Sequence, residues 1–464
     1  MPSRLLILGL MTTAAAALAG AALADPPGRV GRIAALEGDV SFQPPQQDVW
    51  TDASVNFPVT AGEAFWTGDD GRAELEIGGV EARLDNQTEV DVAALSYGAM
   101  RLALPQGSLS VQVRGAPRGG VTVSTPAGDV QLPGAGFYRV DVGAPQEDGS
   151  YPPVEVTVFA GEAEAPGPQG YTAVEARQAA VLYAGADPEL QDAQDTAIDD
   201  WSRGRARLEQ RTRAAAELPE AMTGAGDLGR YGEFAASPDY GTMWFPRDLP
   251  PDWAPYRDGR WAYVAPWGYT WIDDQPWGFA PFHYGRWARI DGRWGWIPGE
   301  AAPEPVYAPA LVAFIGGPGW SLDVNLGAGE ALGWVPLAPD EVYRPPYEVS
   351  DAYIRRVNVT NVKTTTIDTV IVNKTVNAVT VNTYRNAPAV TVVRSDAVSR
   401  GASVRKAVVL VSAEAIARAP AARPAVAAPM LVSAPWAAIS RTRDKRPDLV
   451  QRPHFTSSVR VCRR

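Results

Sequence analysis

The sequence predicts a mainly β protein with an N-terminal β-sandwich or β-roll, a linker helix, a Trp-rich antiparallel β-hairpin module and a disordered C-terminal tail. Residues 30–182 alternate short apolar runs with Gly, Pro and Asp turns at the spacing of an all-β sandwich or roll. Eleven of the fifteen tryptophans lie between Trp244 and Trp334. Beyond residue 395, Ala, Pro, Arg and Val dominate without periodicity, which is typical of disorder.

Residues 1–24 have the pattern of a signal peptide. Arg4 supplies a positive charge, Leu5–Ala19 form an apolar stretch, and Ala22–Ala24 form a small-x-small cleavage site. The apolar run is short for a bilayer span, and no later window reaches about 20 apolar residues, so we expect no transmembrane segment after cleavage. The pattern predicts a periplasmic or secreted protein.

The charge is unevenly distributed along the chain. The formal net charge is −11, yet the stretch from Asp396 onward holds thirteen Lys and Arg against four Asp and Glu. An acidic body with a basic tail lacks the basic folded face of a nucleic-acid binder, so we expect no nucleic-acid partner. Cys462 is the only cysteine, which excludes an intramolecular disulfide and leaves an intermolecular bond and the oligomeric state open.

Residues 30–182 are predicted to form one β-domain. Val154, Val156 and Val158 alternate with polar residues and therefore face one side of a strand. A series of short segments makes this stretch resemble the FecR domain of bacterial exported and signalling proteins. The segments are Leu36–Val40, Pro58–Glu63, Gly71–Leu75, Leu104–Leu109 and Gly136–Val140.

The resemblance to FecR domains implies a binding or scaffold domain and not a catalyst. Founding members of that family are transmembrane regulators that pass a signal from an outer-membrane receptor to a sigma factor. Because this chain shows no anchoring helix, we do not expect the relay role to carry over.

Residues 187–218 are predicted to form the linker helix. Acidic residues from Asp187 to Asp195 lie in its first turns and basic residues from Arg205 to Arg213 in its last turns, which suits the helix dipole. Ile198, Trp201 and Leu208 give a narrow apolar stripe. We interpret this helix as a strut between domains, with dimerisation as the alternative.

Residues 226–345 form the predicted Trp-rich module, in which Asp-Gly pairs flanked by aromatic residues indicate tight hairpins. A turn at Asp291-Gly292 pairs Arg289 with Trp294 and Trp287 with Trp296, and places all four on one face. The same reasoning at Asp258-Gly259 opposes Tyr256 to Trp261.

The repeated aromatic segments, such as Trp267–Trp271, Trp277–Trp287 and Trp294–Gly299, resemble a Trp-rich domain of unknown function found in exported bacterial proteins, family 6600. The resemblance implies architecture and export, and no activity. Two interpretations of the cluster stay open: a packed aromatic core, or an exposed platform that stacks on sugars. In the second, the candidate ligand-binding residues are Trp271, Asp273, Asp274, Trp277, Trp287, Arg289, Trp294 and Trp296.

The sequence offers little catalytic chemistry, and we predict no enzyme, no metal site and no cofactor. Only His283 and His454 are present, and no Gly-x-Ser-x-Gly elbow occurs. One cysteine and two histidines cannot build a Cys/His zinc site. Carboxylate pairs such as Glu74 with Glu76 fall at alternate strand positions and look like solvent faces.

Residues 353–394 are rich in Val, Thr and Asn, whose β-propensity predicts an extended segment. Residues 395–464 are predicted to form the basic disordered tail, with a short helix near Ala407–Arg418. The sequence as a whole predicts a non-enzymatic exported binding or scaffold protein of the bacterial cell envelope. The alternative is a carbohydrate-binding or peptidoglycan-binding protein that uses the Trp face.

Overall fold

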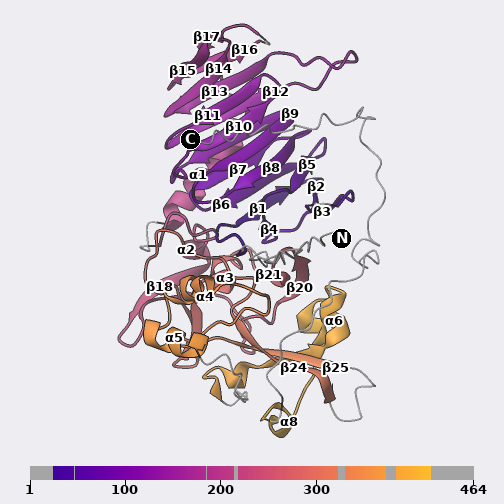
Figure 1. Cartoon of the computed structure of the whole chain (residues 1–464), viewed down its shortest axis with the longest axis vertical. Helices are drawn as coiled ribbons and strands as arrows, with labels where there is room; N and C mark the ends of the chain where they lie inside the picture. Colours follow the sequence, from indigo (N-terminus) through magenta and orange to yellow (C-terminus); the bar gives the residue numbers. More distant parts are fainter. Residues whose placement is uncertain are drawn as a thin grey trace, which may run out of the picture.

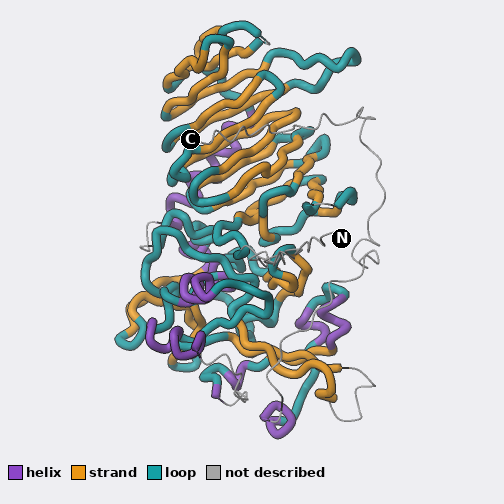
Figure 2. Tube along the Cα trace, viewed as in Figure 1, coloured by secondary structure: helices purple, strands orange, loops and turns teal. Residues whose placement is uncertain are grey.

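The structure is a computed structural model that describes residues 25–45, 47–183, 185–213, 218–321, 330–372, 383–417 and residue 419. The predicted signal peptide, residues 1–24, and Cys462 lie outside these residues. The mainly β class is confirmed, with a large N-terminal sheet structure, one long helix and small Trp-rich sheets (Figures 1 and 2). Within the described ranges, no helix is long and apolar enough to cross a membrane.

The N-terminal domain is a two-layered roll that forms the upper part of Figure 1. One buried cluster joins side chains of both layers, including Leu75 and Val156 from one and Phe65 and Val123 from the other. Its strands are β1 (Gly31–Glu37), β2 (Val40–Gln43), β3 (Thr51–Asp52), β4 (Pro58–Val59), β5 (Ala64–Thr67), β6 (Arg72–Ile77), β7 (Val80–Leu84), β8 (Glu89–Leu95), β9 (Met100–Val113), β10 (Val121–Thr125), β11 (Gly128–Leu132), β12 (Gly136–Val142), β13 (Val154–Ala160), β14 (Glu162–Gly167), β15 (Gly170–Glu175), β16 (Gln178–Leu182) and β17 (Glu189–Asp192).

The two layers share one long strand, β9. The first layer runs β4-β1-β6-β7-β9-β12-β13-β16-β17, and the second runs β3-β2-β5-β8-β9-β10-β11-β14-β15. Residues 100–106 of β9 pair in the second layer and residues 107–113 in the first. Gly107 lies at the crossing with a φ of +99°, and a Cβ there would lie 2.3 Å from Oγ1 of Thr88. Only glycine fits this passage between layers.

The helix α1 (Ala197–Arg213) lies against the roll, and it begins ten residues later than the sequence predicts. Residues 189–192 form strand β17 on β16 instead of the first helical turns. Thr196 N donates to the Asp199 carboxylate at 2.8 Å, which closes the first turn as a capping box does. Arg139 of the roll pairs with the same carboxylate, and Arg205 donates to Glu74 Oε1 at 2.6 Å.

The prediction that Glu74 lies on a solvent face is wrong. The Glu74 carboxylate is buried and also accepts from Nε of Arg83 at 2.7 Å. Burial works against its charge, but the guanidinium groups of Arg83 and Arg205 outweigh that effect and lower its pKa to about 2. Glu74 therefore ties the linker helix to the roll as an ionised carboxylate.

The C-terminal part forms the lower half of Figure 1 and consists of small sheets and short helices. Its sheets run β18-β19-β23-β22, β20-β21 and β24-β25-β26. The elements are α2 (Leu228–Tyr231), β18 (Gly232–Ser237), β19 (Gly241–Pro246), β20 (Gly259–Val264), β21 (Gly268–Asp273), α3 (Ala280–His283), β22 (Arg286–Ile290), β23 (Arg293–Ile297), β24 (Val312–Ser321), β25 (Glu330–Pro336), α4 (Asp351–Asn358), α5 (Thr364–Val372), η2 (Ala387–Ala389), β26 (Thr391–Arg394), α6 (Ser395–Ser399), α7 (Val404–Ala407) and α8 (Ala413–Ala417).

The hairpin at Asp291-Gly292 is confirmed in register, since Arg289 lies opposite Trp294 and Trp287 opposite Trp296. The hairpin predicted at Asp258-Gly259 is wrong. Strand β20 pairs with β21, with Trp261 opposite Trp271. Tyr256 cannot extend a strand before this turn, because its φ is +59° and its hydroxyl donates to Phe282 O at 2.8 Å in the interior.

The extended segment predicted over 353–394 is also wrong for most of its described length. Ser350 caps α4 by accepting from Tyr353 N at 3.1 Å. Ile367 and Ile371 lie one turn apart in α5 and are buried, so packing outweighs the β-propensity of the surrounding threonines and valines. Among the described residues of this segment, only Thr391–Arg394 form a strand, β26, on β25.

The prediction of disorder over 395–464 fails for the portion that the structure describes. Residues 395–417 contain three short helices, and α8 falls within the predicted helix near 407–418. Ala397, Val398 and Val404 are buried against the tryptophan cluster. Arg405 donates to both carboxylate oxygens of Asp258 at 2.8 Å. Residues 420–464 lie outside the described residues.

Buried Glu63 makes the stability of the roll dependent on pH. Its carboxyl accepts from Thr60 N at 3.1 Å and Thr60 Oγ1 at 2.9 Å, and burial raises its pKa from 4.5 to about 8. The folded protein therefore keeps this proton up to about pH 8, whereas the unfolded chain loses it near pH 4.5. We expect this group to lower the free energy of unfolding as pH rises through that window.

Glu63→Gln should remove this contribution because the amide does not titrate. Denaturant unfolding measures the free energy of unfolding at each pH. Between pH 5 and pH 8 this free energy should fall less in the variant than in the unsubstituted protein, by on the order of 3 kcal/mol. Glu147→Gln, at an exposed position, is the matched control and should retain the full pH dependence. Equal pH profiles for Glu63→Gln and the unsubstituted protein would contradict this account.

Candidate functional site

The tryptophan cluster is a packed core. Ten of the eleven tryptophans between Trp244 and Trp334 are buried, and Trp294 is half-buried. Several neighbouring rings meet edge to face, as between Trp244 and Trp277, whose centroids lie 4.9 Å apart at 64°. This arrangement is favourable for aromatic pairs in an interior.

The buried indoles also hold the surrounding backbone through their N–H groups. Nε1 of Trp244 donates to Leu228 O at 2.9 Å, and Nε1 of Trp287 donates to Pro281 O at 2.8 Å. Two further backbone bonds of this kind are Trp296 Nε1 to Tyr284 O at 2.8 Å and Trp334 Nε1 to Tyr256 O at 2.9 Å. These indoles are thus engaged on both their apolar faces and their polar edges.

The predicted platform residues do not form one open face. The expectation of exposure is wrong for Trp271, Trp277, Trp287 and Trp296, each of which is at most 2 % exposed. These side chains cannot stack on a sugar in this structure. Of the other residues proposed for the platform, Arg289 and Asp274 are exposed, and Trp294 is half-buried and packs against the buried cluster.

Asp273 has a structural role in the loop that follows β21. Its carboxylate is buried and accepts from Trp271 Nε1 at 3.0 Å and from Gln275 N at 2.9 Å. Burial raises its pKa well above the ordinary value. A Cβ at Gly278 would lie 2.5 Å from the Asp273 side chain, so the loop closes tightly around this group.

The loop at 273–276 contacts the roll. The side-chain amide of Asn56 donates to Asp273 O at 3.1 Å and to Gln275 O at 2.6 Å. Arg32, which is 1 % exposed, donates to Pro276 O at 3.1 Å and to Glu76 Oε2 at 2.8 Å, and it pairs with Asp227. We refer to this buried contact between roll and module as the seam.

Further polar bonds extend the seam. Thr223 Oγ1 donates to Val30 O at 2.7 Å and accepts from Gly78 N at 3.0 Å. Gly224 N donates to Glu76 Oε1 at 2.9 Å. The two domains are therefore joined by hydrogen-bonded buried groups, which fix their relative position.

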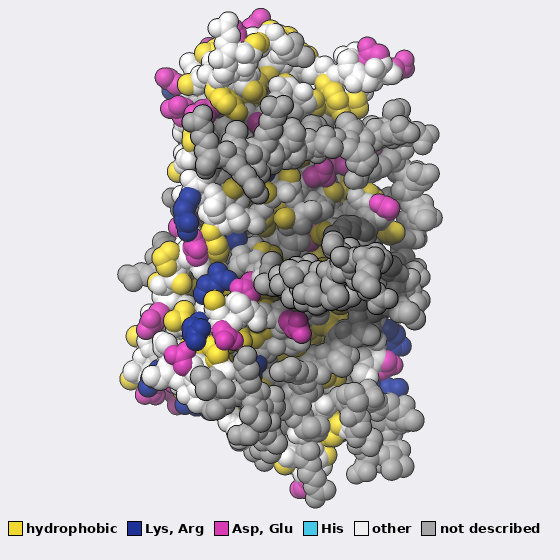
Figure 3. Space-filling model, in the orientation of Figure 1, with side chains coloured by type: hydrophobic (Ala, Val, Ile, Leu, Met, Phe, Trp, Pro, Cys, Tyr) yellow, Lys and Arg dark blue, Asp and Glu magenta, His cyan; other side chains and the backbone are white. Residues whose placement is uncertain are grey.

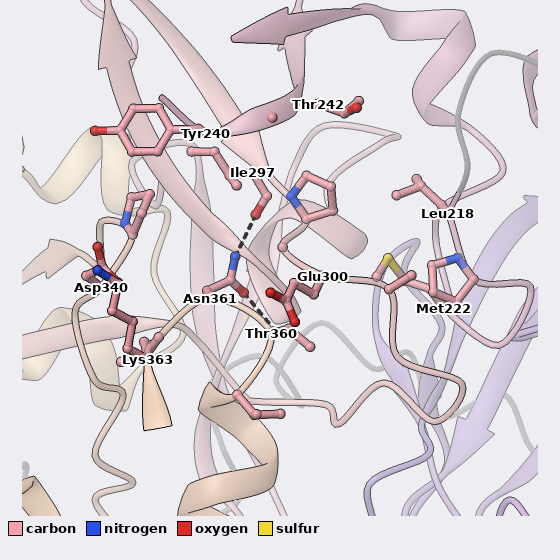
Figure 4. A pocket seen from close by; sticks show the side chains of 18 of the residues that line it. Leu218, Met222, Tyr240, Thr242, Ile297, Glu300, Asp340, Thr360, Asn361 and Lys363 are labelled. Carbon is pink, nitrogen blue, oxygen red and sulfur yellow. Dashed lines mark hydrogen bonds between the residues drawn. The ribbon is translucent and has the colours of Figure 1, made fainter. Parts of the chain in front are cut away.

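A groove of about 640 Å³ is the candidate binding site (Figure 4). It lies where the β18–β19 turn, the segment after β23, the segment after β25 and the turn between α4 and α5 meet. Its floor is held by Glu300 N donating to Thr360 O at 2.8 Å and Asp340 N donating to Asn361 O at 3.0 Å. Asn361 Nδ2 also donates to Ile297 O at 3.3 Å.

The groove has acidic walls. Asp239, Glu300 and Asp340 line it and are exposed, and Lys363 is the one cation among its described lining residues. Tyr240 and Leu218, both half-buried, add apolar surface. Such a lining suits a ligand with a positive or hydrogen-bonding group and an apolar part. Sequence reasoning missed it because its walls come from segments far apart in the chain, with no shared motif.

The one histidine among the described residues lies in the interior, away from solvent. His283 is fully buried, its Nδ1 lies 2.7 Å from Ala308 O, and burial lowers its pKa to about 3, so it is neutral at physiological pH. In the described ranges no three His, Cys, Asp or Glu side chains cluster as a metal site would require.

Arg32→Met tests the seam. Removing the guanidinium leaves the carboxylates of Glu76 and Asp227 without their shared cation, and breaking a buried ion pair from one side costs about 3 to 5 kcal/mol. Urea unfolding should show a decrease of this size in the free energy of unfolding. The transition followed by Trp fluorescence should also separate from the transition followed by the far-UV signal of the roll. The control Arg72→Met removes a more exposed ion pair with Asp85 and should cost less than about 1 kcal/mol. The role of the seam would be contradicted if Arg32→Met lowered the free energy of unfolding only slightly and both signals still changed in one transition.

Two crystal structures from Parabacteroides distasonis ATCC 8503, each of a candidate anti-sigma factor, are similar to part of this chain. One match has 14% identity, covers 30% of this chain and 65% of that chain, and has a TM-score of 0.26. The other has 12% identity, covers 34% and 75%, and has a TM-score of 0.26. No curated protein shows significant similarity.

Two family descriptions match separate parts of the chain. Residues 63–164 match the family described as FecR protein, within the roll. Residues 225–341 match the family of unknown function DUF6600, within the Trp-rich module. The chain therefore carries a FecR domain followed by a DUF6600 domain.

Proposed function

We propose that this protein is a non-enzymatic, exported binding scaffold of the bacterial cell envelope. The proposal of export rests on the signal-peptide pattern of residues 1–24. The proposal of binding without catalysis is supported by the FecR domain and by the buried, neutral state of His283.

The observation that carries the proposal is an open acidic groove on a module that is rigidly joined to the roll. Asp239, Glu300 and Asp340 present carboxylates at its walls, and the floor residues are hydrogen-bonded within the protein. A partner in this groove is held without a large rearrangement, because the site is already formed. The seam then fixes that partner relative to the FecR domain.

The partner that suits the groove is an envelope protein with a cationic surface group. Three carboxylates against Lys363 leave an excess of negative charge at the groove. Complementary charge mainly increases the rate and specificity of association, and the apolar surface of Tyr240 and Leu218 supplies burial.

Carbohydrate or peptidoglycan binding is the second candidate, and a different surface favours it. Tyr263 and Tyr269 lie opposite each other on β20 and β21, with ring centroids 6.2 Å apart. Tyr263 is 43 % exposed, unlike the buried tryptophans nearby. This tyrosine pair is an aromatic surface of the module that sugars can reach.

Photo-crosslinking at the groove tests the scaffold function. A benzophenone amino acid replacing Thr242 should yield a discrete protein adduct in the intact envelope. Glu300→Lys with Asp340→Lys should reduce its yield about tenfold by reversing the charge of the groove. Glu147→Lys with Asp148→Lys, an equal charge change on an exposed loop of the roll, is the control and should leave the yield unchanged. The proposal would be refuted if the charge reversal at the groove left the adduct yield unchanged. It would also be refuted if the protein turned over a substrate and this activity depended on one acidic or imidazole side chain.

Co-sedimentation with purified sacculi tests the second candidate. If the tyrosine pair binds glycan, Tyr263→Ala should weaken sedimentation by about tenfold, because an aromatic contact contributes about 1 kcal/mol or more. Tyr171→Ala, at an exposed tyrosine of the roll, is the matched control. Glycan binding would be refuted if all three proteins sedimented equally or if none of them sedimented.

A further inference from the structure

The upper end of the roll has an open sheet edge. Strand β17 pairs with β16, and no other described strand lies on its outer side. All four of its residues are exposed. In an antiparallel pair every second residue directs its N–H and C=O away from the partner, so this edge can accept a further strand.

The hydrophobic core is also unfinished at this end. Leu190 of β17 lies opposite Ala180 of β16, and directly opposed residues share a face. Ala180 and its neighbour on that face, Leu182, are buried, but Leu190 is 49 % exposed. An added strand with apolar side chains at alternate positions would cover Leu190. The opposite end of the roll needs no such cover, since the seam closes it.

The charge of this end favours a cationic occupant. β17 carries Glu189 and Asp192, and Glu162 lies directly opposite Glu175 on β14 and β15. Like charges in opposed positions are destabilising unless a cation lies nearby. Acidic and hydrophobic side chains lie together at the upper end of Figure 3. A second copy of β17 would add further carboxylates, so pairing between copies is disfavoured.

The chain itself contains a segment with the required pattern. Residues 456–464 read Thr-Ser-Ser-Val-Arg-Val-Cys-Arg-Arg, in which Val459 and Val461 alternate with Arg460 and Cys462. The segment has no Pro or Gly to weaken a strand. Residues 420–464 hold nine Lys and Arg against two Asp and Glu.

We propose that residues 456–464 dock in the same molecule on the outer edge of β17 as an added strand, with Val459 or Val461 over Leu190 and the arginines beside Glu189 and Asp192. This docking would leave the groove free, so it stands apart from the proposed function.

The intervening chain is long enough for this docking. The described part of the chain ends near α8, at the lower end of Figure 1, and residues 420–455 must span from there to β17. Fully extended, these residues reach about 120 Å. At the usual spacing of about 4.8 Å between strands, the first layer of the roll rises about 40 Å. The remaining length spans the smaller module.

Cys462 allows a direct test, because it is the only cysteine and lies within the proposed strand. Four full-length variants place a second cysteine on β17: Glu189→Cys, Leu190→Cys, Gln191→Cys and Asp192→Cys. Under mild oxidation at low protein concentration, at least one should form an intramolecular disulfide within minutes. Tyr263→Cys, at a similarly exposed position in the module, should form it at least about tenfold more slowly.

A charge variant provides an independent measurement. In the protein with Cys462 as its only thiol, Glu189→Lys with Asp192→Lys should speed the reaction of Cys462 with a thiol reagent at least about fivefold. Glu147→Lys should leave that rate unchanged. The proposal is overturned if all four β17 variants cross-link no faster than Tyr263→Cys. It is also overturned if the disulfides are intermolecular and depend on concentration, which would assign the edge to a second copy.

Discussion

The position of Arg32 determines how the two domains of this protein are arranged. Its guanidinium is buried between Glu76 of the roll and Asp227 of the module, with Asn56 and Pro276 as further partners. Burial works against the charge, and the two carboxylates outweigh it and raise the pKa of Arg32 above its ordinary value. Because one carboxylate comes from each domain, separating the domains would leave buried charges unpaired. A buried charge without its partner is strongly unfavourable, so the domains keep one arrangement.

The abundance of tryptophan follows from the small size of the sheets in the module. Short strands leave many backbone carbonyl groups without a ladder partner, and a buried carbonyl without a donor is unfavourable. An indole offers both a large apolar surface and one N–H donor. The carbonyls of Leu228, Pro281 and Tyr284 each receive such a donor from the cluster. The tryptophans thus replace both the apolar core and part of the hydrogen bonding that a larger sheet would supply.

Local patterns were predictable from the sequence, and contacts between distant segments were not. The turn at Asp291-Gly292 sets the pairing of its own flanking residues, so the register could be derived from the turn alone. The same dipeptide at Asp258-Gly259 failed because Tyr256 is held by Phe282 and Trp334, which lie far along the chain. Likewise α5 is helical despite its β-branched residues because Ile367 and Ile371 pack in the interior. The groove and the seam consist almost entirely of such distant contacts, and single-sequence patterns carry no signal for them.

A rigid seam favours holding partners over relaying a signal between domains. A relay requires two arrangements of similar free energy that a ligand can shift. Moving the roll against the module would break the Arg32 ion pairs together with the bonds of Asn56 and Thr223, and water cannot replace them at a buried contact. A ligand at the groove would need a differential affinity larger than this combined loss to stabilise a second arrangement. If the groove on the module and the open edge on the roll bind as proposed, the seam holds these two surfaces at a fixed spacing, so that binding at one leaves the geometry of the other unchanged.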